Sequence, residues 1–278
     1  MNIGIIGLGL IGGSFAKSIK ARTSHNVLGS DLDKETMMFA RICGAMDGEL
    51  TEDNIGTCDM ILLSISPGAT IGWMKEHASQ INKNTTVIDM CGVKRSICAE
   101  LCALAETYEF SYIGGHPMAG KERSGFVNAA DDLFVGASMI LTPDKHTEIT
   151  QLEQIKALFT DIGFATLTFT SPEEHDSIIA YTSQLAHITS SAYVKSPTAQ
   201  QRRGFSAGSF KDMTRVARLD ENMWTELFLA NSDNLSKELE TLITHLEEYL
   251  SALKNNDAET LRQLLKDGKE KKATAGGN

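Results

Sequence analysis

The first twelve residues constrain the fold of this chain more than any other stretch. An apolar run, Met1–Ile6, leads into a glycine-rich segment that reads GLGLIG, and apolar residues at helical spacing follow over Leu10–Ala21. Such a segment turns tightly, brings backbone N–H groups close to a pyrophosphate and packs the helix against the strand. The helix N-terminus adds partial positive charge for the phosphates. The predicted dinucleotide contacts are Gly7, Leu8, Gly9, Leu10, Ile11 and Gly12. An ordinary turn is the alternative.

Asp31 follows a second predicted strand, Asn26–Ser30. In a dinucleotide-binding unit, a carboxylate at this place accepts hydrogen bonds from a ribose diol and repels a 2′-phosphate. We therefore expect the cofactor to be NAD rather than NADP. The alternative is a carboxylate that only caps the next helix.

Alternating strand and helix patterns continue to residue 170. Further strands are expected at Met60–Ser64, Thr86–Asp89, Phe110–Ile113, Ala137–Leu141 and Ala165–Phe169. This alternation predicts βαβ units on a parallel sheet. From Ser171 the strand patterns fade, and Ser-Pro-Glu-Glu is typical of a helix start. We predict an α/β, Rossmann-like dinucleotide-binding domain over residues 1–170. An all-α substrate-binding and dimerisation domain follows over residues 171–278, its tail from Gly268 without regular structure.

One helical segment carries a repeat of large apolar residues at alternating spacings of four and three. Its members are Leu235, Leu239, Leu242, Leu246, Tyr249 and Leu253. The spacing is that of a coiled-coil seam, although the run is short. Packing within one subunit and packing between two subunits of a homodimer both explain it.

Composition excludes several classes of partner. The 278 residues carry a formal net charge of −10, which argues against nucleic acid and anionic membranes. No apolar run is long enough to span a membrane, and the N-terminus has no basic region typical of a signal peptide. Five cysteines form an odd set without zinc-ligand spacing. We expect reduced thiols, no metal and a cytoplasmic protein that acts on a small molecule.

His116 follows the strand predicted to end at Ile113, after Gly114 and Gly115. Ligands of open α/β sheets bind outside the carboxyl ends of the strands. The two glycines would let the loop pass close to a cofactor, and Pro117 favours an extended His116. A neutral imidazole there would accept a proton from a substrate hydroxyl during hydride abstraction. A loop histidine with structural hydrogen bonds is the alternative.

The second half of the chain supplies candidate cations. Lys211 and Arg215 lie four residues apart, so they share one face of a helix. A guanidinium suits a substrate carboxylate, because it donates two parallel hydrogen bonds. His187 lies among apolar neighbours on another predicted helix. Taken singly, Lys211 and Arg215 also read as a solvated surface pair, and His187 as a core histidine.

Three segments together resemble a known enzyme family. GLGLIGGS, GGHPMAGKERSG and SFKDMTRVARLDENMW follow in this order, and the chain is similar over nearly its whole length to the prephenate/arogenate dehydrogenases. The resemblance implies oxidative decarboxylation of prephenate with NAD in tyrosine biosynthesis. It implies that His116 is catalytic and that Arg215 binds the ring carboxylate. Around the substrate it implies Lys211, His187, Gly208, Lys121 and Glu122, with Trp224 as either a site residue or a packing residue.

Two positions depart from the family pattern. The family serine that helps to hold the ring hydroxyl is replaced by Gly92, and Lys121 stands where a small or hydroxyl residue is common. The choice between prephenate and arogenate, or both, therefore stays open. Another β-hydroxyacid dehydrogenase would explain the glycines but not the other two segments. A catalytically inactive NAD-binding protein is the remaining alternative, against which the retained His116, Lys211 and Arg215 argue.

Overall fold

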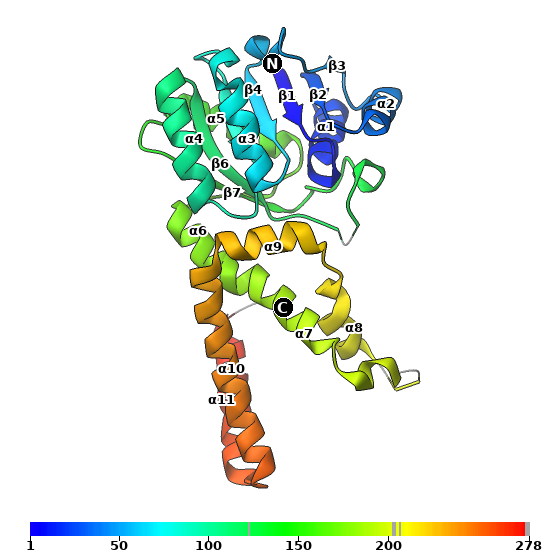
Figure 1. The fold of residues 1–278 in the computed structure, drawn as a ribbon, viewed down its shortest axis with the longest axis vertical. Coiled ribbons are helices and arrows are strands. Elements are labelled where there is room, and N and C mark those ends of the chain that lie inside the picture. Colours follow the sequence, from blue (N-terminus) through cyan, green and yellow to red (C-terminus); the bar gives the residue numbers. More distant parts are fainter. Residues whose placement is uncertain (122, 202–203, 206, 276–278) are drawn as a thin grey trace. The chain divides into compact units, whose positions relative to one another are not determined.

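The structure is a computed structural model that describes residues 1–121, 123–201, 204–205 and 207–275. The chain forms two compact units, Met1–Asn231 and Ser232–Asn278. Within the described residues, the first unit holds an eight-stranded sheet in the order β3-β2-β1-β4-β5-β6-β7-β8 (Figure 1). Its strands are β1 (Asn2–Ile6), β2 (Asn26–Ser30), β3 (Gly48–Glu49), β4 (Met60–Leu63), β5 (Thr86–Asp89), β6 (Ser111–Pro117), β7 (Ser138–Pro143) and β8 (Thr166–Phe169).

The order from β3 to β6 is that of a Rossmann-like sheet, with the reversal of strand order between β1 and β4. Helices cover both faces of the sheet. One face is covered by α1 (Leu10–Arg22) and α5 (Ile149–Asp161), and the other by α3 (Pro67–His77) and α4 (Arg95–Tyr108). α2 (Lys34–Ile42) follows β2. In β4, Met60 and Leu62 join one core, whereas Ile61 and Leu63 join the other. This alternation is what a strand buried on both faces requires. The predicted Rossmann-like fold is confirmed.

One strand pair differs from the expected parallel arrangement. β6 and β7 pair antiparallel, with His116 opposite Ile140 and Pro117 opposite Met139. A parallel crossover requires a dozen or more residues, usually with a helix. The connection between these strands carries only the short 3₁₀ turn Phe126–Asn128 among its described residues, so the chain returns alongside β6. This pairing extends β6 beyond Ile113 and places His116 on a strand.

Helices follow the sheet, as predicted. They are α6 (Pro172–Ile179), a π-helical segment (Ala180–Leu185), α7 (Ala186–Tyr193), α8 (Gly208–Thr214) and α9 (Glu221–Ala230). Ser171 caps α6, because its side chain accepts a hydrogen bond from Glu174 N at 3.1 Å. These helices belong to the same compact unit as the sheet. The expected boundary at residue 170 marks a change of structural type and stays a prediction.

The second unit is a helical hairpin of α10 (Ser232–Lys254) and α11 (Ala258–Ala275). Tyr249 Oη donates to Leu264 O at 3.3 Å across the hairpin. The expectation of an irregular tail from Gly268 is wrong as far as Ala275, because Gly268 lies within α11, whose surrounding residues favour helix. Several large apolar side chains of the hairpin are exposed: Ile243, Leu246, Leu250, Leu253 and Leu265.

Candidate active site

The glycine loop after β1 has the geometry of a dinucleotide cradle. Gly7 has a φ of +83°, which other residues rarely adopt, and a Cβ on Gly12 would overlap the Gly7 carbonyl oxygen. A Cβ on Gly9 would meet nothing within 4 Å, so the backbone is open there. Gly9 is also the N-cap of α1 and makes no side-chain capping bond. The helix N-terminus is thus available to a phosphate.

Asp31 lies next to this loop. Its carboxylate accepts hydrogen bonds from Leu8 N at 2.7 Å and from Asp33 N at 2.9 Å. The following helix, α2, is capped by Asp33 instead, which accepts from Glu35 N and Thr36 N. Asp31 is therefore no helix cap. Each of its oxygens retains a lone pair for a ribose diol, as the dinucleotide interpretation requires.

A pocket of about 720 Å³ lies at the carboxyl ends of β4, β5 and β6, and we call it the sheet-edge pocket. It contains the start of α1 (Leu10 and Ile11), the residue after β4 (Ser64) and the end of β6. Residues from the helices that follow the sheet close it. The predicted site residues that line it are Leu10, Ile11, His116, Lys121, His187 and Arg215, together with Gly92 and Trp224. An imidazole from the first half and a guanidinium from the second thus share one pocket.

His116 is held on β6 by tight backbone packing. A Cβ on Gly114 would collide with Thr142, and one on Gly115 would lie 2.7 Å from the Asp89 carbonyl oxygen. The two glycines therefore allow close strand packing, and the expected close approach to a cofactor stays a prediction. Burial, and then the neighbouring His175 and Lys94, hold the pKa of His116 well below the ordinary 6.5. The imidazole is neutral near pH 7, which suits a proton acceptor.

His187 and Trp224 form a wall of the same pocket. Their ring centroids lie 4.0 Å apart, and His187 Nδ1 donates to Val216 O at 3.1 Å. Burial lowers the pKa of His187, and the nearby charge of Arg215 lowers it further. Arg215 follows the last residue of α8 and is exposed, so its guanidinium is accessible to a ligand in the pocket.

Other residues singled out by the resemblance lie elsewhere. Lys211 and Gly208 are exposed on α8 and do not line the sheet-edge pocket. α8 gives way to a 3₁₀ turn at Arg215, so the regular spacing expected for Lys211 and Arg215 does not continue past Thr214. Lys121 lines the pocket, and its Nζ donates to Asn128 O at 3.0 Å. Glu122 lies outside the described residues.

The sequence did not predict two buried residues that lie close to His116. One contacts His116 directly, and the other contacts it through the first. His175 Nε2 lies 2.9 Å from His116 Nδ1, and His175 Nδ1 lies 2.8 Å from an Asp176 oxygen. Both lie in α6, just after the Ser-Pro-Glu-Glu helix start. In the sequence they are an adjacent His-Asp pair. Nothing in the local sequence indicates that both side chains become buried.

A buried ion pair lies beneath this end of the sheet. Lys94 Nζ contacts Asp89, and both side chains are fully buried. Tyr112 Oη donates to the other Asp89 oxygen at 2.7 Å, and Cys91 N donates to Asp89 at 3.0 Å. These bonds satisfy the carboxylate and fix the segment that carries Gly92.

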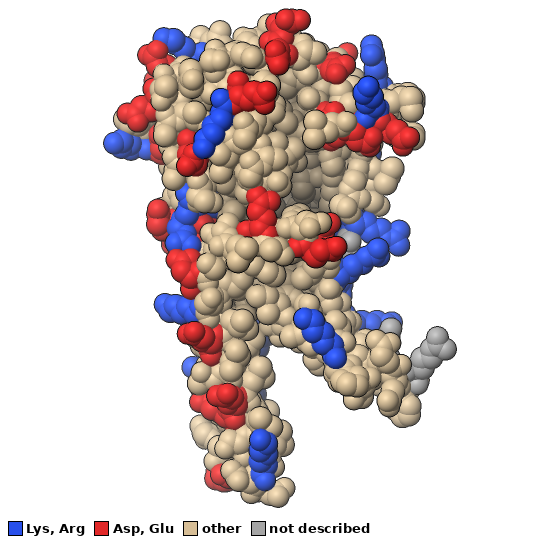
Figure 2. All heavy atoms as spheres, in the orientation of Figure 1, with Lys and Arg blue, Asp and Glu red and all other residues tan. Residues whose placement is uncertain are grey.

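Charges around the sheet-edge pocket suit an anionic ligand. Arg215, Lys121 and Arg218 line it, with Asp220 as the acidic residue among its described lining. Figure 2 shows acidic and basic side chains interspersed over the visible face, with a gathering of basic ones at the right, level with α9. The chain as a whole is acidic. Because cations outnumber acids among the described residues that line the sheet-edge pocket, this pocket is the local basic site that a small dicarboxylate needs.

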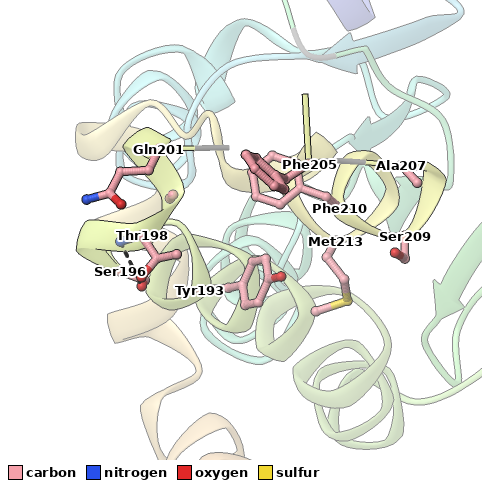
Figure 3. A pocket seen from close by; sticks show the side chains of 10 residues that line it. Tyr193, Ser196, Thr198, Gln201, Phe205, Ala207, Ser209, Phe210 and Met213 are labelled. Atoms are coloured by element: carbon pink, nitrogen blue, oxygen red, sulfur yellow. Dashed lines mark hydrogen bonds between the residues drawn. The ribbon is translucent and has the colours of Figure 1, made fainter. Parts of the chain in front are cut away.

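A second cavity, of about 780 Å³, lies among α7, α8 and the turn Pro197–Gln201, and we call it the helical cavity. Figure 3 shows its aromatic and polar side chains. Tyr193 and Phe210 have ring centroids 6.1 Å apart, and Phe205 is 91% exposed. Its described lining holds no charged side chain. The described lining therefore offers no carboxylate or imidazole for proton transfer and no cation for a carboxylate.

Neither a metal site nor a membrane span is found in the described part of the chain. No group of three or more His, Cys, Asp or Glu side chains is placed there to hold a metal ion. No described helix is both long and apolar enough to cross a bilayer.

Comparisons with known proteins cover both structural parts. A family model described as "Prephenate dehydrogenase, nucleotide-binding domain" matches residues 15–167, and "Prephenate dehydrogenase, dimerization domain" matches residues 171–267. The prephenate dehydrogenase of Lactococcus lactis is 31% identical over 274 residues, which cover 96% of this chain and 75% of the relative.

Solved structures show the same similarity. Prephenate dehydrogenase from Aquifex aeolicus, in complex with hydroxyphenyl propionate and NAD+, is 29% identical with a TM-score of 0.84, covering 99% of this chain and 98% of that one. Synechocystis arogenate dehydrogenase is 25% identical with a TM-score of 0.82, covering 99% and 100%.

Proposed function

Because the chain belongs to the prephenate dehydrogenase family, we propose that it converts prephenate to 4-hydroxyphenylpyruvate and CO2 with NAD as the oxidant, a reaction of tyrosine biosynthesis. One observation carries this proposal. His116 and Arg215 line a single pocket together with Leu10 and Ile11 at the start of α1. A candidate proton acceptor, a cation that can bind a carboxylate and the N-terminus of a helix that can bind a phosphate thus lie in one pocket.

The residues around the glycine loop fit NAD. Open backbone at Gly9, the uncapped N-terminus of α1 and the carboxylate of Asp31 would hold its pyrophosphate and ribose. When bound, NAD would accept a hydride from the ring carbon that carries the substrate hydroxyl. The protein contributes placement and electrostatics.

His116 acts as the general base in this mechanism. Its Nδ1 is engaged by His175, so Nε2 is the atom available to the substrate hydroxyl. The imidazole is neutral and takes the hydroxyl proton as the ring carbon is oxidised. Loss of CO2 from the ring then yields an aromatic product, which makes the reaction effectively irreversible.

Arg215 binds the ring carboxylate and so orients the carbinol carbon toward the cofactor, an effect of proximity and orientation. Lys121 and Arg218 supply positive charge for the second carboxylate. His187 and Trp224 form the wall beside the substrate side chain. For Lys211, Gly208 and Glu122, the roles implied by the family pattern stay predictions.

Arogenate is the second candidate substrate. It carries an amino group where prephenate carries a keto group, and Asp220 lines the sheet-edge pocket, where a carboxylate would favour an ammonium. Asp220 is partly engaged, since it caps α9 by accepting from Met223 N at 2.9 Å. The surplus of cations over acids in the pocket favours prephenate.

Three further proposals concern the whole protein. We propose a division near residue 170 between nucleotide binding and substrate binding. We propose a homodimer formed through the helical part, supported by exposed apolar residues such as Leu246, Leu253 and Phe205. We also propose a cytoplasmic location, since the five cysteines are free thiols.

Initial rates of NADH or NADPH formation test the proposed function. Purified protein is assayed with prephenate and with arogenate, each in the presence of NAD or NADP. The expected result is turnover of prephenate with NAD, and weaker turnover in the other three combinations. A strong preference for NADP would contradict the role of Asp31. No turnover of either substrate would contradict the proposal.

A further inference from the structure

Three side chains form a hydrogen-bonded row from the sheet-edge pocket into the protein interior. His116 Nδ1 lies 2.9 Å from His175 Nε2, and His175 Nδ1 lies 2.8 Å from Asp176 Oδ1. His116 comes from β6, whereas the other two come from α6. His175 and Asp176 are 2% and 0% exposed, and neither lines the pocket. They therefore act on a ligand only through His116.

Asp176 is anchored as a carboxylate. It accepts hydrogen bonds from Lys94 N at 2.7 Å and from Arg95 N at 2.9 Å, and Arg95 Nε lies 3.3 Å away. Burial raises the pKa of Asp176, but hydrogen bonds from His175 and from these backbone groups lower it further, so the net pKa is below the ordinary value. Asp176 is thus ionised near pH 7 and only accepts hydrogen bonds.

This fixes the position of each imidazole proton. Burial also lowers the pKa of His175, so His175 is neutral near pH 7 and carries one ring proton. Because Asp176 only accepts, that proton is on His175 Nδ1, and His175 Nε2 is an acceptor. His116 is neutral as well and must donate from Nδ1 to His175 Nε2. Its lone pair is then on Nε2.

His116 Nε2 is the atom that faces the pocket. A Cβ on Gly92, which lines the pocket, would lie 3.9 Å from this nitrogen. Gly92 has no hydroxyl that could orient the ring from this side. The hydrogen bond at Nδ1 is therefore the contact that orients His116 among the described residues around it.

We infer that His175 and Asp176 are positioning residues that hold His116 in the tautomer whose Nε2 accepts the proton of the substrate hydroxyl. The identity of that hydroxyl rests on the proposed function. Asp176, fixed at the start of α4, orients His175, and His175 orients His116. The arrangement also assists proton transfer, since the imidazolium formed at His116 shares its Nδ1 proton with a histidine that contacts a carboxylate.

Charged groups near the row favour a neutral resting state. Lys94 and Asp89 form the buried ion pair after β5, and Arg95 lies at the start of α4. The Lys94 charge disfavours a second cation at His116, whereas Asp176 favours one. The resting row is thus neutral at both imidazoles, and it tolerates a transient charge during turnover.

Nitrogen-15 NMR of histidine-labelled, ligand-free protein tests the tautomers directly. Multiple-bond proton–nitrogen correlations distinguish an imidazole protonated at Nδ1 from one protonated at Nε2. The expected result is Nδ1–H for both His116 and His175. His77 is the matched control, because its Nδ1 lies 2.9 Å from the Trp73 carbonyl and must also carry the proton. An Nε2–H tautomer at His116 would overturn the inference.

Two substitutions at one position separate positioning from simple packing. His175→Gln retains an oxygen that accepts from His116 Nδ1 and an amide that donates to Asp176, whereas His175→Leu retains neither. We expect His175→Leu to convert part of His116 to the Nε2–H tautomer and to lower kcat by about 10²-fold, with KM nearly unchanged. His175→Gln should recover most of this loss and leave His116 protonated at Nδ1.

The outcomes distinguish this inference from the proposed function. Equal loss of kcat in His175→Gln and His175→Leu, with the His116 tautomer unchanged, would show a packing role and overturn the inference. The NMR experiment requires no substrate. If wild-type protein shows the expected tautomers but turns over neither prephenate nor arogenate, the proposed function fails and the assigned tautomers stand.

Discussion

The sheet-edge pocket and the helical cavity are similar in volume, about 720 and 780 Å³, but differ in the described residues that line them. The sheet-edge pocket combines strand ends and helices, and it brings together His116, Arg215 and the start of α1. The helical cavity has aromatic, small and uncharged polar side chains among its described lining. Size therefore does not identify the site. The convergence of a neutral imidazole, a guanidinium and a helix N-terminus on one pocket is what favours this pocket as the active site.

The largest expected effect comes from removing the base in the sheet-edge pocket. His116→Asn should lower kcat by roughly 10²–10⁴-fold, the usual contribution of a general base, with a smaller change in KM. Steady-state kinetics with prephenate and NAD give both constants. Near-normal turnover in this variant would remove His116 from the mechanism and weaken the contrast between the two cavities.

Arg215 and Lys211 provide a matched pair of cations, one inside and one outside the sheet-edge pocket. Arg215→Ala should weaken substrate binding by about 2 kcal/mol, the lower end for a broken charge pair, because Arg215 is exposed in the free protein. Lys211→Ala should change KM little. Equal losses in both variants would mean that the substrate site extends beyond the pocket.

Gly92→Ser tests the departure from the family pattern. A Cβ there would lie 3.4 and 3.6 Å from the two Cδ atoms of Leu227, which are ordinary contacts, so the side chain fits. Its hydroxyl would lie near His116 Nε2 and the substrate hydroxyl. One added hydrogen bond of about 0.5–1.5 kcal/mol should lower KM by roughly 2- to 13-fold. A large rise in KM would instead show that the pocket requires the empty space at Gly92.

The pH dependence should be weak across the neutral range. Burial first, then His175 and Lys94, depress the pKa of His116 well below 6.5. A base must be deprotonated to act, so kcat/KM should rise with pH only at acidic values and stay level through neutrality. A profile of kcat/KM against pH measures this. An acid limb centred at or above 6.5 would contradict a buried, neutral His116.

The helical cavity should respond differently from the sheet-edge pocket. Phe205 is 91% exposed, so Phe205→Ser should not affect the core of the subunit. If the homodimer covers this cavity, the variant should weaken self-association, as measured by sedimentation, and leave turnover unchanged where the protein is dimeric. A loss of turnover in the intact dimer would assign the helical cavity a part in the reaction.

The sheet half of the protein was largely predictable from local sequence. Strands such as Asn26–Ser30 and Thr86–Asp89 were placed correctly, because buried apolar runs and glycine loops are local patterns. The antiparallel pairing of β6 with β7 was not, since pairing depends on the length and content of the connection. The extension of β6 over His116 follows from that pairing and was missed with it.

The sequence predicted the side chains that line the candidate site better than the residues that surround them. His116, His187 and Arg215 line one pocket, whereas Lys211 and Gly208 lie outside it. Because α8 ends at Thr214, Lys211 and Arg215 do not lie on one continuous helix face. His175 and Asp176 were missed altogether. Their importance arises from α6 packing against the end of β6 and the start of α4, a contact between residues far apart in the chain.

A crystal structure of the protein with NAD and hydroxyphenyl propionate tests the central claim most directly. The account predicts the phenol oxygen within hydrogen-bonding distance of His116 Nε2, about 2.6–3.2 Å, with the nicotinamide ring beside it and the ligand in the sheet-edge pocket. Binding of the ligand in the helical cavity, or an orientation that leaves His116 without contact to the phenol, would contradict it.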